Sequence, residues 1–185
     1  LYRTNEGNVF VTRNAMRPNW NEYFMASAFL ASFRSHDDQS KVGAVLVNSE
    51  RKEVSRGYNG FCSGIEENGL DTTRPGKYKY IVHAEANALS NLVIKIDKAS
   101  LYCTRMPCLN CSKLLWQNNV REWYVPTGCV NTDEVPIRVK NYSEEEEQIL
   151  QLLLRSGLKI SYVDFDMDRL TEIIQNNNKY FSYLG

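Results

Sequence analysis

The stretch "YKYIVHAEANALSN", residues 78–91, brings a histidine and a glutamate, His83 and Glu85, to the beginning of a helix. Residues 84–91 predict that helix because they carry Ala and Leu and contain neither Gly nor Pro. Positions i and i+2 of a regular helix point in different directions, so a target shared by both side chains requires one of them to precede the helix. On this stretch alone, a surface glutamate and a hydrogen-bonded histidine are the alternative.

Two cysteines with ligand-like spacing follow in "RMPCLNCSKLLWQNN", residues 105–119. Pro107 suits the first turn of a helix, because its missing N–H would be unpaired there. Cys108 and Cys111 then share one helical face, and the positive end of the helix dipole favours their thiolate forms. By itself the C-x-x-C pattern is also compatible with a redox pair after the strand-like residues 100–106, or with coincidence.

His83 is what favours a metal site over those alternatives. With Cys108 and Cys111 it supplies three ligands, which is typical of a catalytic zinc that keeps a fourth position for water. Glu85, just inside the helix, is then left free to move protons. The combined pattern, H-A-E, then residues 86–106, then P-C-x-x-C, is that of the zinc nucleobase deaminases.

Composition narrows the class of protein. The 185 residues include 22 Lys plus Arg and 22 Asp plus Glu, so the basic surplus expected of a general nucleic-acid binder is missing. The sequence has neither an apolar run of roughly 20 residues nor an N-terminal signal pattern, and we expect a cytoplasmic protein, with the nucleus as a further compartment. The start at Leu1 suggests a trimmed sequence or part of a longer polypeptide. Five unevenly spaced cysteines, at 62, 103, 108, 111 and 129, indicate free thiols or metal ligands.

The pattern of apolar residues and turns predicts an α/β fold. We expect helices at residues 21–35, 84–91, 107 onward and 143–156, and strands at residues 43–47, 53–57, 100–104, 122–126 and 159–165. The first two strands are close enough to form an antiparallel pair, and the later strands alternate with helices, which implies parallel connections. We therefore predict a three-layer sandwich, in which a mixed five-stranded sheet carries helices on both faces.

The sequence resembles the cytidine deaminase superfamily and, within it, the dCMP deaminases. The stretches that carry this resemblance are "WNEYFMASAFLASFRS", "KVGAVLVNSE", "SRGYNGFCSG", and "HAEANAL" with "MPCLNC". The G-Y-N-G loop followed by a later Gly is the discriminating piece, although on its own it predicts only a turn. The resemblance implies a zinc-dependent deaminase domain at residues 19–166, between an N-terminal extension (1–18) and a C-terminal helix and tail (167–185).

The resemblance also implies a hydrolase that converts a deoxycytidine nucleotide, dCMP to dUMP, with Zn²⁺ on His83, Cys108 and Cys111. Asn59 is expected to hydrogen-bond the sugar 3′-hydroxyl, with the backbone near Ala84 and the side chain of Asn87 as further substrate contacts. Allosteric dCTP or dTTP is expected near the loop that carries Tyr58, Gly60 and Gly64. A homo-oligomer, a hexamer or a trimer, is the expected assembly.

Two departures from the dCMP deaminases concern recognition of the 5′-phosphate. Val82 stands where a Cys usually precedes H-A-E, and "PTGCVNTDE", residues 126–134, replaces an acidic segment that bears a tyrosine. They make dCTP the alternative substrate, as in the related two-domain cytidine and dCMP deaminase proteins. Cationic candidates near the motifs are Lys41, Arg105 and Lys113, with solvated surface charge as the alternative for each.

Two other classes share the zinc pattern. A polynucleotide deaminase should offer basic or stacking surfaces, and the neutral charge balance argues against it. An inactive regulatory subunit could also retain zinc. Because this sequence keeps Glu85, the residue expected to move protons, that interpretation lacks positive support.

Overall fold

The centre of the molecule is a mixed sheet of five strands. A computed structural model describes residues 2–3, 9–10, 17–66, 68–131 and 138–177. The strands of the sheet are β3 (Gly43–Asn48), β4 (Glu53–Tyr58), β7 (Ala99–Cys103), β8 (Val120–Pro126) and β11 (Lys159–Val163). They lie in the order β11-β8-β7-β3-β4, in which β3 is antiparallel to β4 and β7, while β7, β8 and β11 are parallel. The predicted mixed five-stranded sheet is confirmed.

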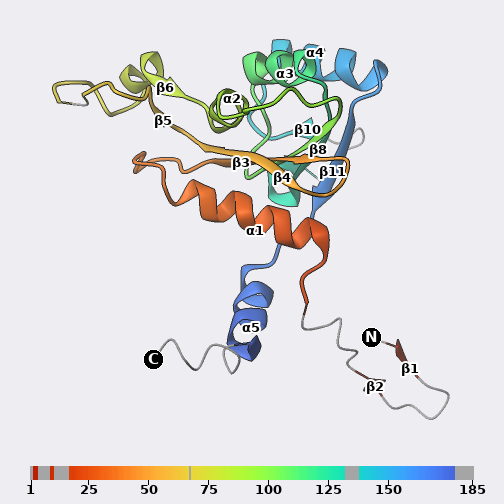
Figure 1. Ribbon diagram of the computed structural model, residues 1–185. Helices are drawn as coiled ribbons and strands as arrows, with labels where there is room; N and C mark the ends of the chain where they lie inside the picture. The colour runs from red at the N-terminus through yellow and green to blue at the C-terminus, as the bar shows by residue number, and fades with distance from the viewer. Residues whose placement is uncertain (1, 4–8, 11–16, 67, 132–137, 178–185) are drawn as a thin grey trace.

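Helices cover both faces of this sheet (Figure 1). α1 lies on one face, and α2, α3 and α4 lie on the other. The helices are α1 (Trp20–Ser32), α2 (Ala84–Ser90), α3 (Leu109–Gln117), α4 (Glu144–Arg155) and α5 (Met167–Asn177). The shorter elements are β1 (Tyr2–Arg3), β2 (Val9–Phe10), β5 (Gly60–Phe61), η2 (Gly76–Lys79), β6 (Ile81–Val82), η3 (Thr127–Cys129), β9 (Val130–Asn131) and β10 (Arg138–Val139). The three-layer arrangement predicted from the sequence is therefore present.

The apolar alternation of β3 explains why it occupies the middle of the sheet. Ala44 and Leu46 belong to the hydrophobic cluster beneath α2 and α3, whereas Val45 and Val47 belong to the cluster beneath α1. Successive strand residues point to opposite faces, so a strand that is apolar at every position must be covered on both. The run "GAVLV" thus fixes β3 between two helical layers.

Two glycines let helices approach the sheet closely. A Cβ on Gly43 would lie 1.9 Å from the carbonyl oxygen of Ala28 in α1. A Cβ on Gly57 would lie 2.3 Å from the Ala88 nitrogen and 2.4 Å from the Ala84 oxygen in α2. Since real Cβ atoms do not come this close to backbone, Gly57 determines how near α2 lies to β4.

Element boundaries differ from the prediction mainly at helix ends. α1 ends at Ser32 rather than at residue 35. The N–H groups of the next three residues each bond the carbonyl oxygen three residues back, so the chain forms a turn narrower than that of an α-helix. α4 begins after Ser143, whose side chain and that of Glu146 form a capping box. Among the described residues, none of the helices is long and apolar enough to span a membrane.

The division of the chain into an N-terminal extension, a deaminase domain and a C-terminal tail, with boundaries after residues 18 and 166, stays a prediction. α5 follows β11, and an ion pair of 2.7 Å between Arg169 Nε and Glu22 Oε1 ties it to the beginning of α1. Residues 132–134 of the variant segment after β8, and residues 178–185 of the tail, lie outside the described residues.

Candidate active site

Two helix entrances converge on the candidate site. His83 is the N-cap of α2 and has an extended backbone (φ −72°, ψ 154°), so it precedes the helix that contains Glu85. Cys108 is the N-cap of α3 (φ −66°, ψ 172°), and Cys111 lies inside that helix. Pro107 was expected in the first helical turn, and this is wrong: the extended backbone of Cys108 delays the helix to Leu109.

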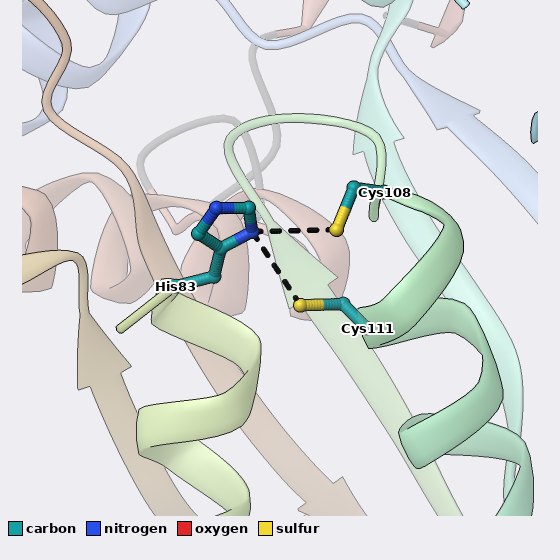
Figure 2. A group of neighbouring side chains, drawn as sticks. All are labelled: His83, Cys108 and Cys111. Carbon is teal, nitrogen blue, oxygen red and sulfur yellow. Dashed lines mark hydrogen bonds between the residues drawn. The ribbon is translucent and has the colours of Figure 1, made fainter. Parts of the chain in front are cut away.

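The side chains of His83, Cys108 and Cys111 point toward one another across these entrances (Figure 2). His83 Nδ1 lies 3.4 Å from Cys108 Sγ and 3.6 Å from Cys111 Sγ. Zinc bonds of about 2.0–2.3 Å at tetrahedral angles place ligand atoms roughly 3.5–3.8 Å apart. The three side chains therefore fit one zinc ion as they stand, and this group is called the ligand cluster below.

The thiols of the ligand cluster share a proton unequally. A hydrogen bond from Cys111 lowers the pKa of Cys108 to about 3, and His83 adds to this effect. The same hydrogen bond raises the pKa of Cys111, which keeps its proton. The contact with Cys108 also raises the pKa of His83. The cluster thus holds negative charge on sulfur, which is the form that binds a metal cation.

Glu85 is a buried carboxyl group beside the ligand cluster. Glu85 is 4% exposed. Burial raises the pKa of its carboxyl group to about 7, although the hydrogen bond from its own backbone N–H and the charge of His83 act to lower that pKa. A carboxyl group with a pKa near neutrality can both accept and return a proton at neutral pH. Glu85 therefore has the chemistry expected of a general acid and base.

A cavity of about 220 Å³ joins Glu85 to the ligand cluster through His83 and Cys108. One water needs only about 10–15 Å³ on this measure, so the cavity admits a larger ligand. Among the residues predicted from sequence, Asn59, Ala84 and Arg105 line it. Its wall also includes residues that the sequence did not single out, namely Asp37, Arg74, Lys77 and Tyr78. Nothing in the sequence around these four residues marked them as site residues, because they lie in polar segments without a periodic pattern.

Other predicted site residues lie elsewhere. Asn87 does not line the cavity; its Nδ2 donates to the Tyr58 carbonyl oxygen at 2.9 Å and so ties α2 to the end of β4. Lys41 donates to the carbonyl of Ser35, and neither Lys41 nor Lys113 lines the cavity. Gly60 and Gly64 are also outside its wall, and Gly64 has the positive φ of 81° that favours glycine in a turn.

The remaining cysteines stand apart from the ligand cluster. Cys103 is buried at the end of β7, Cys62 is exposed, and Cys129 is half-buried with its Sγ 3.8 Å from the Thr104 carbonyl oxygen. Within the described part of the chain, His83, Cys108 and Cys111 form the group of His, Cys, Asp and Glu side chains arranged to hold a metal ion.

Known proteins share both the sequence pattern and the fold. Residues 18–127 match the family described as the cytidine and deoxycytidylate deaminase zinc-binding region. The chain belongs to this family. The resemblance inferred from the H-A-E and P-C-x-x-C motifs is thereby confirmed.

Deoxycytidylate deaminases from animals and from a phage are similar to this chain. The deoxycytidylate deaminase of Homo sapiens is 44% identical over 114 residues, which cover 56% of this chain and 62% of the human protein. The deoxycytidylate deaminase of Mycobacterium phage D29 is 37% identical over 128 residues, covering 60% of this chain and 96% of the phage protein. The chain thus spans less than two thirds of the length of the human relative.

A solved structure of this family has a similar fold. The dCMP deaminase from the cyanophage S-TIM5, in complex with dCMP and dUMP, superposes with a TM-score of 0.62 at 28% identity. The match covers 80% of this chain and 98% of the phage protein. The five-stranded sheet and its helices are therefore the cytidine-deaminase-like fold.

Proposed function

We propose that this chain catalyses the zinc-dependent hydrolytic deamination of a deoxycytidine nucleotide, dCMP to dUMP plus ammonia. The observation that carries the proposal is the placement of buried Glu85 in one cavity with His83 and Cys108 of the ligand cluster. Family membership supports the reaction type, and relatives named deoxycytidylate deaminase support the substrate.

The metal would be held by the ligand cluster. Zinc bound there supplies Lewis acidity that makes hydroxide available near neutral pH. Two thiol groups and one imidazole are a donor set that zinc accepts, and three protein ligands are typical of catalytic zinc. The chain's own contribution is to hold these donors at the entrances of α2 and α3.

Glu85 carries the protons of the reaction. It accepts a proton from the attacking water and delivers it to N3 of the pyrimidine while the hydroxide oxygen bonds to C4. The resulting tetrahedral carbon bears both the new oxygen and the amino group. Glu85 then takes the hydroxyl proton and passes it to the amino nitrogen, so that the C4–N bond breaks and ammonia leaves. One carboxyl group suffices because each delivery uses the proton accepted just before.

Two arginines support a phosphorylated substrate. Arg74 and Arg105 line the cavity, their residues are exposed, and neither has an ion-pair partner among the residues described. A guanidinium group without a partner matches a phosphate well, because it offers parallel N–H donors and a fixed positive charge. Two such groups also keep dCTP as the alternative substrate, since they could meet more than one phosphate.

Regulation and assembly follow from the family resemblance alone. Allosteric dCTP or dTTP near Tyr58, Gly60 and Gly64, and a hexamer or trimer, are part of the proposal on that ground. Sedimentation of the purified protein measures the assembly, and ammonia release from dCMP with and without each nucleotide measures the regulation.

The reaction is tested by ammonia release from a substrate panel. The panel contains dCMP, dCTP, deoxycytidine, cytosine and a single-stranded oligodeoxynucleotide. We expect turnover of a free deoxycytidine nucleotide, with dCMP ahead of dCTP. Preferential deamination of the oligonucleotide would favour the polynucleotide class, and absence of turnover on every substrate would favour the regulatory subunit.

A further inference from the structure

A buried ion pair forms part of the wall of the cavity. Lys77 Nζ lies 2.6 and 2.7 Å from the two carboxylate oxygens of Asp37, and the two side chains are 3% and 5% exposed. Lys77 belongs to the short turn η2, whereas Asp37 belongs to the loop after α1. Both residues line the cavity that contains Glu85. The pair therefore joins η2 to the loop after α1 in the wall of the candidate substrate site.

Asp37 is held in its charged form. The backbone N–H groups of Gln39 and Ser40 donate to its Oδ1 at 2.8 and 3.0 Å. Burial raises the pKa of Asp37, but the hydrogen bonds from Lys77 and from these two N–H groups outweigh it, and the pKa is lowered. Asp37 thus neutralises the ammonium charge of Lys77 and fixes its position.

The described residues use two of the three donors of Lys77. An ammonium group has three N–H donors, and two of the Lys77 donors go to Asp37. Among the described residues the third has no acceptor. Buried donors without acceptors are costly, so a ligand oxygen is the natural partner for this N–H. Because the ion pair is neutral, a neutral hydroxyl group suits it better than a phosphate does. A phosphate suits Arg74 and Arg105, which have no ion-pair partner among the described residues.

Asn59, the residue expected from sequence to bind the sugar, is largely engaged by the protein. Its Oδ1 accepts from the Val42 N–H at 2.7 Å, and its Nδ2 donates to the Ser40 carbonyl oxygen at 2.8 Å. The same Nδ2 lies 3.4 Å from Asp37 Oδ2. Both amide hydrogens of Asn59 thus have protein acceptors, whereas the neighbouring Lys77 has a third N–H with no acceptor among the described residues.

From this geometry we propose that Lys77, held by Asp37, donates a hydrogen bond to the 3′-hydroxyl oxygen of the deoxynucleotide. Lys77 is then a residue that determines specificity at the sugar, and Asp37 is its positioning residue. The inference rests on the proposed function, because it assumes that a deoxycytidine nucleotide enters the cavity.

The test compares dCMP with 2′,3′-dideoxycytidine 5′-monophosphate, which lacks the 3′-hydroxyl. We expect the unmodified enzyme to prefer dCMP by at least about tenfold in kcat/KM, the usual effect of losing a hydrogen bond to a charged donor. Lys77→Met should bring the two substrates within about threefold of each other, because it removes the donor. In Arg74→Gln, the matched control, preference for the 3′-hydroxyl should persist while preference for dCMP over deoxycytidine falls.

The outcomes separate the inference from the proposed function. Equal kcat/KM for the two substrates in the unmodified enzyme overturns the inference and leaves deamination intact, as does undiminished preference in Lys77→Met. Absence of turnover on both dCMP and dCTP overturns the proposed function itself; if dCTP is the better substrate, dCTP and its dideoxy analogue replace the monophosphates. Zinc content and thermal unfolding report whether Lys77→Met is folded. If it is not, the pair Asp37→Asn and Lys77→Met, which leaves no unpaired charge, is measured in the same way.

Discussion

At the scale of single residues, the site depends on the placement of one buried carboxyl group, that of Glu85, beside the partly exposed ligand cluster. Glu85 lies in a water-poor environment that favours its protonated form, next to sulfur and imidazole groups that favour a cation. Its carboxyl group is therefore suited to exchange protons, while the ligand cluster is suited to hold zinc. Separate substitutions distinguish these two roles.

Glu85→Gln should leave zinc bound while it abolishes proton transfer. Because the amide keeps the size of the carboxyl group but cannot carry the proton, we expect turnover to fall by about 10² to 10⁴. Elemental analysis for zinc and ammonia release measure the two effects on one sample. Glu50→Gln makes the same chemical change at an exposed residue and should change neither the zinc content nor the rate of ammonia release. Near-normal turnover in Glu85→Gln would remove Glu85 from the mechanism.

Cys111→Ala should release zinc and lower thermal stability, because the free energy of metal binding contributes to folding. Cys129→Ala is the matched control, since its sulfur lies outside the ligand cluster and should be dispensable for zinc. Zinc content and the unfolding temperature of both variants provide the comparison. Equal zinc content in the two variants would contradict the ligand assignment.

At the scale of elements, the site exists because α2 and α3 begin next to each other above the sheet. The sequence predicted the helix entrance at His83 and the spacing of the cysteines, because those signals are local. It did not predict the ribbon of β5 and β6, whose two-residue strands are too short to show an alternation. Nor could it predict the pair of Asp37 and Lys77, since two loop residues 40 positions apart leave no periodic trace.

Gly57→Ala should disturb the site from a distance. The added Cβ would meet the Ala84 oxygen at 2.4 Å, so α2 must move and carry Glu85 with it. Overpacking of this kind costs roughly 1–3 kcal/mol, and we expect lower stability in urea together with lower turnover. Gly128→Ala, with nothing within 4 Å of its added Cβ, is the control and should change stability little. Wild-type stability and turnover in Gly57→Ala would show that this close approach is not required.

At the scale of the whole molecule, polar residues from segments outside the sheet line the cavity beside the ligand cluster. The cavity combines Arg74 and Arg105, which have no ion-pair partner among the described residues, with the neutral pair of Asp37 and Lys77. This division predicts that a phosphate and a sugar hydroxyl are recognised by different residues. The net charge of zero does not reveal this division, because the division depends on which charged residues line the cavity.

Arg105→Gln should weaken the preference for phosphorylated substrates. We expect dCMP to lead deoxycytidine by on the order of 10²-fold in kcat/KM in the unmodified enzyme, and loss of one guanidinium contact to reduce that ratio by about tenfold or more. Lys113→Gln removes a positive charge outside the cavity and should leave the ratio unchanged. Steady-state kinetics on both substrates measure the ratio. An equal ratio in Arg105→Gln and in the unmodified enzyme would show that the phosphate lies elsewhere.

In the proposed function, one zinc ion on His83, Cys108 and Cys111 enables this chain to deaminate dCMP. The direct measurement follows zinc content and dUMP formation in one preparation, before chelation, after chelation, and after zinc is restored. We expect about one zinc per chain, loss of dUMP formation when zinc is removed, and recovery when it returns. Unchanged dUMP formation in chelated, zinc-free protein would contradict it.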